Sequence, residues 1–136
     1  MERIAGVAVA AAFAVSMFCW RMPAEAQIGT WEAPPEAKNL KRPAGADDKS
    51  QERGQRLFRQ NCVPCHGESG RGDGPMGKAL GIKPGNLTNA ERMGRHTDGE
   101  IFWKISKGKE PMPVFELKLS ARDRWDLVGY VRTLAR

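Results

Sequence analysis

The sequence predicts an all-α protein in which three main helices carry most of the apolar side chains. Apolar residues recur at helical spacing within residues 50–61, within residues 97–107 and after Ser120. Thr97 and Glu100 have the spacing of a capping box, which satisfies free backbone N–H groups at the start of a helix. No segment shows the convincing apolar alternation of a strand, so we expect helices joined by loops.

Glycine occurs inside two of the predicted helices, at Gly54 and Gly129. In the first helix, Gly54 shares one face with Leu57, Phe58 and Asn61. A glycine in a helix interior costs about 1 kcal/mol relative to alanine. That cost suggests that another helix approaches Gly54 closely, the alternative being a tolerated surface glycine. Gly129 marks a second candidate for such a contact.

Two cysteines and a histidine follow the first predicted helix in the order Cys62-Val63-Pro64-Cys65-His66. This Cys-x-x-Cys-His order is the pattern of covalent c-type haem attachment. The two thiols add to the two vinyl groups of the haem, and the histidine binds the iron as its proximal ligand. The sequence therefore predicts one haem c, bound through Cys62 and Cys65, with His66 as a metal ligand.

Other interpretations of the same motif need features that the sequence lacks. A thioredoxin-like disulfide between Cys62 and Cys65 would require βαβ patterning, and no strand-rich run is present. A zinc site could use these cysteines with His66 and His96. Structural zinc sites usually have paired clusters of ligands, and no second cluster exists. A chance occurrence is the remaining alternative, and the helix and loop that flank the motif argue against it.

Residues 50–136 are few for a polypeptide core alone, so a domain of this size is marginal without further stabilisation. A haem would supply a large apolar plate around which the helices pack. The glycine-rich residues 67–85 do not follow a strand and lack the order of a phosphate-binding loop. We expect this loop to wrap a flat group at short range, with one helical turn within residues 76–81.

Residues 1–26 have the features of a secretory signal peptide. Arg3 supplies a short positive region, residues 4–20 are apolar, and Ala24 and Ala26 provide the small-x-small cleavage pattern. We expect cleavage between Ala26 and Gln27 and a periplasmic location. The alternative is an uncleaved membrane anchor, for which this apolar stretch is at the short end of the required length.

Residues 27–49 form a Pro-containing N-terminal extension with mixed charges and little apolar content. Prolines at positions 34, 35 and 43 predict a mostly extended chain. Trp31 and Leu40 are candidates for docking onto the following domain. For Trp31, an exposed position in a mobile tail is an equal alternative.

The chain is basic, with 22 lysines and arginines against 16 aspartates and glutamates, which gives a net charge of +6. A basic surface can attract nucleic acid, anionic membranes or acidic proteins. The basic residues are scattered without a long run, so we expect no nucleic-acid patch. Acidic protein partners are the remaining expectation, with membrane contact only through an uncleaved N-terminal segment.

Together these segments resemble the class I cytochrome c family of the bacterial periplasmic type, over residues 50–136. The resemblance rests on the motifs Gly54-x-x-Leu57-Phe58, Cys62-Val63-Pro64-Cys65-His66, Gly72-Asp73-Gly74-Pro75, Pro111-Met112-Pro113 and Leu127-Val128-Gly129-Tyr130. It implies a cytochrome c fold, with three main helices packed around one covalent haem. It also implies that Gly54 and Phe58 pack on Leu127 and Tyr130, and that the Pro75 carbonyl accepts a hydrogen bond from Nδ1 of the proximal histidine.

Met112 is the candidate for the second axial ligand of the iron. It lies between two prolines in a loop that joins two predicted helices, which suggests a fixed position. A thioether is a soft, neutral donor, and His/Met ligation raises the reduction potential. A methionine that only fills a gap in the core is the alternative. Met76 and Met93 lie in no such loop, and His96 precedes a helix cap, where we expect a surface residue or a neighbour of the haem propionates.

These features predict a periplasmic electron carrier with one c-type haem and His/Met axial ligation. Its partners would be a donor dehydrogenase or bc-type complex and an acceptor oxidase, which dock transiently on a small interface. Alternatives are a fixed cytochrome subunit of a dehydrogenase or oxidase complex and a haem-based gas sensor. The sequence shows no catalytic constellation, so we do not expect an enzyme.

Overall fold

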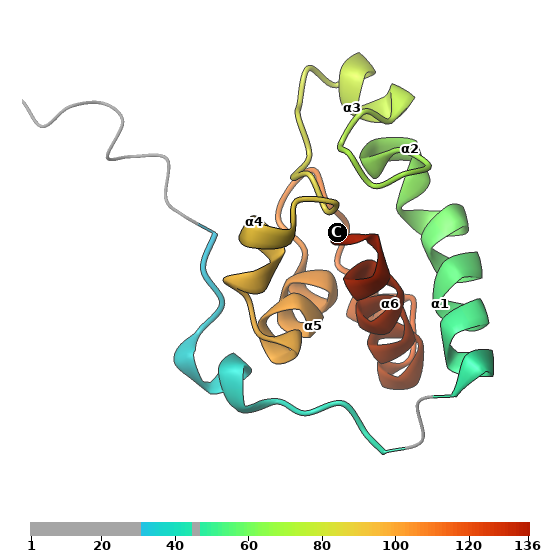
Figure 1. Ribbon diagram of the computed structural model, residues 1–136. Coiled ribbons are helices and arrows are strands. Elements are labelled where there is room, and N and C mark those ends of the chain that lie inside the picture. Colours follow the sequence, from blue (N-terminus) through green and yellow to red (C-terminus); the bar gives the residue numbers. More distant parts are fainter. Residues whose placement is uncertain (1–30, 45–46) are drawn as a thin grey trace, which may run out of the picture. The chain divides into compact units, whose positions relative to one another are not determined.

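The computed structural model describes residues 31–44 and 47–136, and within these ranges the chain consists of helices and loops (Figure 1). The only β-type pairing among these residues is an isolated bridge between Lys109 and Met112. The predicted all-α class is therefore confirmed. The predicted signal peptide, residues 1–26, lies outside the described residues. Within the described ranges, no helix has the length and apolar character needed to cross a bilayer.

The helices have the following bounds: η2 Pro35–Asn39, α1 Asp48–Asn61, α2 Val63–His66, α3 Pro75–Ala79, α4 Ala90–Gly94, α5 Asp98–Lys107, η3 Phe115–Leu117 and α6 Ala121–Leu134. The three long helices α1, α5 and α6 match the three predicted ones. Complete capping boxes begin α5 and α6. Helix α1 begins two residues before the predicted start, because the side chain of Asp47 accepts a hydrogen bond of 2.7 Å from the N–H of Ser50.

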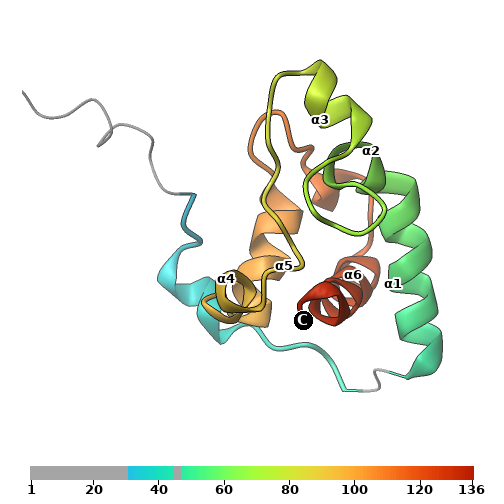
Figure 2. The same cartoon turned by 45° about the horizontal axis from the view of Figure 1, so that its top comes forward.

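Helices α1 and α6 pack side by side, and α6 lies between α1 and α5 (Figure 2). A Cβ atom at Gly54 would overlap the carbonyl oxygen of Asp126 and would lie 2.9 Å from Cβ of Tyr130. The rings of Phe58 and Tyr130 pack with their centroids 5.3 Å apart. The suspected close approach at Gly54 is thus real, and it brings the two helix backbones together at this point.

The core forms where α1, α5 and α6 meet. Its buried apolar side chains are Phe58, Met93, Ile101, Ile105, Phe115, Trp125, Leu127, Val128 and Val131. At its edge, the rings of Phe102 and Trp125 stack with centroids 4.2 Å apart. Such stacking of two large rings adds to the free energy that their burial contributes.

The described part of the predicted extension packs against the helices instead of running free. Ala37 in η2 is only 1% exposed. A Cβ atom at Gly99 would overlap the Ala37 carbonyl oxygen, so η2 sits directly on the start of α5. Residues 31–136 form one compact unit. The structure differs in this respect from the expected boundary at residue 50, which falls inside α1.

Helix α6 contains a buried carboxylate, Asp126, which joins the extension to α1. Its Oδ2 atom lies 2.8 Å from Nε of Arg53, and its Oδ1 atom lies 3.5 Å from Nη2 of Arg42. A buried carboxylate needs such cationic partners, because its desolvation is costly. The guanidinium of Arg42 also lies against Gly129, where a Cβ atom would be 2.6 Å from Nη1. The lack of a side chain at Gly129 therefore leaves room for the guanidinium of Arg42.

We expect Gly54→Ala to lower the free energy of unfolding by at least about 1 kcal/mol, because the new methyl group would force the backbones of α1 and α6 apart. Gly94→Ala is the matched control, since no atom lies within 4 Å of a Cβ atom at Gly94. Urea denaturation measures both variants. Equal stability of Gly54→Ala and the original protein would contradict the close crossing.

Candidate functional site

The short helix α2 places the three residues of the Cys-x-x-Cys-His motif on one surface. The N–H of Cys65 donates to the carbonyl of Cys62 at 3.1 Å, and the N–H of His66 donates to the same carbonyl at 2.7 Å. These bonds wind the motif into a helical turn. Residues at positions i, i+3 and i+4 of a turn share one face, so both thiols and the imidazole line the same wall.

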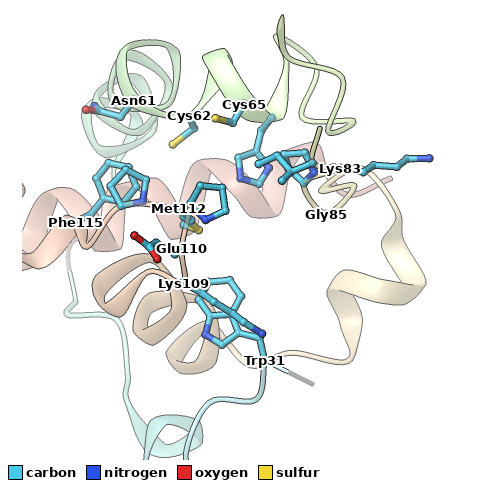
Figure 3. Close-up of a pocket in the computed structure, with 15 residues that line it drawn as sticks. Trp31, Asn61, Cys62, Cys65, Lys83, Gly85, Lys109, Glu110, Met112 and Phe115 are labelled. Atoms are coloured by element: carbon cyan, nitrogen blue, oxygen red, sulfur yellow. The ribbon is translucent and has the colours of Figure 1, made fainter. Parts of the chain in front are cut away.

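A cavity of about 250 Å³ opens against this wall. Cys62, Cys65 and His66 line one side, and Met112 and Trp31 are among the residues that complete its lining (Figure 3). A second cavity of about 180 Å³ shares Cys62, His66, Met112 and Trp31 and continues to the core side chains of α5 and α6. The structure therefore brings together all four predicted site residues: Cys62, Cys65, His66 and Met112.

Met112 is held by the backbone of its own loop. Its N–H donates to the carbonyl of Lys109 at 2.8 Å, which closes a tight turn. Gly108, which ends α5, has φ +60°, and a Cβ atom there would lie 2.5 Å from the Met112 carbonyl oxygen. Such a positive φ and such a short approach both require glycine. Gly108 thus lets the loop fold back so that Met112 reaches the cavity.

The competing methionines occupy different positions. Met76 is 52% exposed in α3 and does not line either cavity. Met93 is buried in α4 and lines only the smaller cavity. Met112 lines both cavities, which makes it the methionine best placed to face a group that fills them.

The imidazole of His66 is largely enclosed. Its Nδ1 atom is buried and has no hydrogen-bond partner among the described residues. The expected hydrogen bond to the Pro75 carbonyl is therefore not formed in the structure. Burial lowers the pKa of His66, while the Gly85 backbone acts in the opposite direction. A lowered pKa keeps the ring neutral, which is the form that binds a metal ion.

Both cysteines of the motif are free thiols. Burial raises the pKa of Cys62 to about 12, and the neighbouring Cys65 acts in the same direction. Within residues 31–44 and 47–136, no group of three or more His, Cys, Asp or Glu side chains could hold a metal ion. Free, half-buried thiols beside an apolar cavity fit covalent attachment of a large apolar group.

Besides His66, the smaller cavity is lined by the basic side chains Arg92, His96 and Lys104, and none of the described residues that line it is acidic. Nζ of Lys104 lies 3.4 Å from Nε2 of His96. Burial and the nearby Lys104 lower the pKa of His96. An apolar cavity with cations on its wall fits a flat apolar molecule that carries carboxylates, as haem does. Of these three residues, only His96 was predicted from the sequence to lie near the haem propionates, because nothing distinguishes Arg92 and Lys104 from ordinary surface residues in the sequence.

The glycine-rich loop folds onto α2. The N–H of Gly72 donates to the carbonyl of His66 at 2.7 Å, and the N–H of Gly74 donates to the carbonyl of Cys65 at 3.1 Å. These bonds satisfy carbonyl groups that the end of a short helix leaves free. A Cβ atom at Gly74 would lie 2.5 Å from the Pro64 carbonyl oxygen. Of the predicted wrapping loop, residues 82–85 line the larger cavity, and Gly85 is the loop glycine among them.

The family model for cytochrome c matches residues 51–135. The chain belongs to the cytochrome c family. Membership implies a covalently bound c-type haem and haem-based electron transfer, in agreement with the free thiols, the enclosed imidazole and the apolar cavity.

Curated relatives of this cytochrome are parts of larger assemblies. It is 33% identical over 92 residues to the cytochrome c subunit of the cytochrome bc1 complex of Corynebacterium diphtheriae, a match that covers 65% of this chain and 29% of the relative. It is 30% identical over 83 residues to subunit FixP of the cbb3-type cytochrome c oxidase of Bradyrhizobium diazoefficiens, covering 60% and 26%. The matched region thus spans less than a third of these relatives.

Solved structures show the same fold. The KustC0563 c-type cytochrome superposes with a TM-score of 0.54 at 30% identity, and the match covers 61% of this chain and 98% of that one. A chain of the reducing HAO-like protein complex Kustc0457/Kustc0458 of Kuenenia stuttgartiensis gives a TM-score of 0.58 at 27% identity, covering 74% and 55%. The cytochrome c fold predicted from the sequence is confirmed.

We expect Cys62 to be alkylated slowly in the folded chain before haem is attached. Because its pKa is raised to about 12, the thiol stays protonated near neutral pH, and only the thiolate reacts. Mass spectrometry of the Cys62 peptide after iodoacetamide treatment should show much slower labelling than in urea, with the rate rising as the pH approaches 12. Equal rates in the folded and the urea-unfolded chain would contradict the burial of this thiol.

Proposed function

We propose that this protein is a mono-haem electron carrier of class I type, with His66 and Met112 as axial ligands. The observation that carries the proposal is that Cys62, Cys65, His66 and Met112 all line the larger of the two cavities. Two axial ligands from the protein leave no open position for a substrate, so we propose no catalytic activity of its own.

Each residue of the site has a separate task. When bound, the haem iron supplies a one-electron couple. Cys62 and Cys65 would fix the macrocycle to α2, and the lowered pKa of His66 favours the neutral ring that could coordinate the iron. The thioether of Met112 is a soft, neutral donor that favours the reduced state. Arg92 and Lys104 would offer positive charge to the carboxylates of the cofactor, and His96 lies beside them.

We expect Met112→Ala to abolish the weak near-infrared sulfur-to-iron band of the oxidised protein while the haem stays attached. Gly108→Ala should weaken the same band, because a Cβ atom would push against the backbone of the Met112 loop. Gly81→Ala is a matched control, since Gly81 also has a positive φ but no atom lies within 4 Å of its Cβ position. Persistence of the band in Met112→Ala would assign the ligand to another residue.

Location and assembly form part of the proposal. The features of residues 1–26 support export to the periplasm, where N-terminal sequencing should find a chain that begins at Gln27. A fixed subunit of a respiratory complex is the second candidate, and the bc1 and cbb3-type relatives favour it. Recovery of the cytochrome in the soluble periplasmic fraction supports the carrier. Co-purification with a membrane oxidase or bc-type complex would favour the subunit.

Lysines near the larger cavity support electrostatic docking of an acidic redox partner. Lys83 and Lys109 line this cavity, and Lys78 lies in the nearby helix α3. Lys107, the last residue of α5, forms an ion pair of 2.8 Å with Glu116, which offsets its charge. The steering of a partner would rest mainly on Lys83 and Lys78.

We expect Lys83→Glu to slow electron transfer with an acidic partner several-fold at low ionic strength, and the difference to vanish at high salt. Lys49→Glu provides the control. Lys49 is also exposed, but it lies in the first turn of α1, at the opposite end from Cys62. Stopped-flow measurement over a series of salt concentrations gives the rates. Rates that do not depend on salt would refute electrostatic docking.

A further inference from the structure

The described part of the N-terminal extension is fixed at several points. We call residues 31–43 the N-terminal strap. In its middle, Ala37 is buried against Gly99 at the start of α5. Towards its end, Arg42 reaches the buried Asp126 and lies against Gly129 of α6. At its beginning, the ring centroid of Trp31 lies 5.6 Å from Nζ of Lys104. The strap thus crosses α5 and α6 with its tryptophan directed to the cavities.

Trp31 is part of the wall of both cavities. All other lining residues among those described come from positions 58–131, so the strap contributes this one side chain to the site. Figure 3 shows the indole on the side of the cavity away from Cys62 and Cys65, beyond Met112. A tryptophan can close a large apolar opening, because its ring buries more surface than other side chains do.

Contact with Lys104 gives the indole a defined position. A cation over an aromatic face is attracted by the ring, and the attraction is stronger where solvent is excluded. Burial lowers the pKa of Lys104, as expected for an ammonium group partly removed from water. The same lysine lines the smaller cavity together with Arg92 and His96. Trp31 therefore covers the basic end of the site.

We propose that the N-terminal strap is part of the haem site, and that Trp31 is a positioning residue that closes the cavity at its basic end and keeps water and small ligands from the Met112 side. The inference rests on the proposed haem site. Its physical basis is that the apolar surroundings of a haem control solvent access and thereby the reduction potential. Gly99 and Gly129 keep the strap in place, because their missing side chains make room for it.

The test uses the haem-loaded full chain and compares four variants. Trp31→Ala removes the ring, and Trp31→Phe keeps an aromatic cover. Gly99→Ala displaces the strap from a distance, because its methyl group would overlap the Ala37 carbonyl. Gly94→Ala is the matched control, with no atom within 4 Å of its Cβ position. The readouts are the reduction potential and the affinity of the oxidised protein for imidazole.

We expect Trp31→Ala and Gly99→Ala to lower the reduction potential and to tighten imidazole binding by about tenfold, which corresponds to about 1.4 kcal/mol. Trp31→Phe and Gly94→Ala should stay close to the original protein in both readouts. No change in Trp31→Ala would overturn the role of Trp31. A change in Trp31→Ala without one in Gly99→Ala would overturn the role of the strap, as would an equal change in Gly94→Ala.

The absorption spectrum separates failure of this inference from failure of the proposed function. Suppose that every variant has a c-type haem spectrum and that the reduction potential and the imidazole affinity do not change. This result would overturn the proposed role of the strap and would leave the proposed electron-carrier function standing. Absence of a c-type haem from the unaltered protein would instead overturn the proposed function.

Discussion

The structure depends on one constraint: two thiols and an imidazole that must reach the same flat group come from five consecutive residues. A single helical turn, α2, satisfies the constraint, because it puts Cys62, Cys65 and His66 on one face. Such a short helix has few hydrogen bonds of its own. The end of α1 supports it on one side, and the N–H groups of Gly72 and Gly74 bind its last carbonyls on the other. The glycine-rich loop is therefore a support for the attachment turn.

The opposite wall is built by long-range packing. Helices α1 and α6 touch at Gly54, and both helices contribute side chains to the smaller cavity, Phe58 from α1 and Leu127 from α6. Gly108 turns the chain after α5 so that Met112 faces the attachment turn. The strap then crosses α5 and α6 and adds Trp31 to the rim. Glycine makes a close approach possible at Gly54, Gly99 and Gly108. The atoms that approach Gly54 and Gly99 belong to segments distant in sequence, and those that approach Gly108 belong to the loop that follows it.

Much of this arrangement could be predicted from the sequence. The long helices have clear apolar periodicity and capping boxes, and the attachment motif is local, so spacing alone identified Cys62, Cys65 and His66. Gly54 was informative because a glycine inside a helix lowers the stability of the helix, which suggested that a close contact requires it there. Docking of the strap was raised from the sequence for Trp31 and Leu40, but its Arg42 anchor could not be predicted, because Arg42 meets Asp126 only after α6 has packed on α1. The short helices α2 and α4 were missed since one turn shows no periodicity. The role expected for Pro75 came from the family resemblance, and here the buried Nδ1 of His66 has no hydrogen-bond partner among the described residues.

All of these contacts have a functional meaning only if a haem is bonded to both sulfurs of the attachment turn. Mass spectrometry of the peptide that contains Cys62 and Cys65 tests this most directly, on protein purified from cells competent in cytochrome maturation and digested after extraction with acidified organic solvent. The account predicts a peptide that retains one haem through two thioether bonds. A peptide of the same protein that carries two free thiols or a disulfide would contradict it.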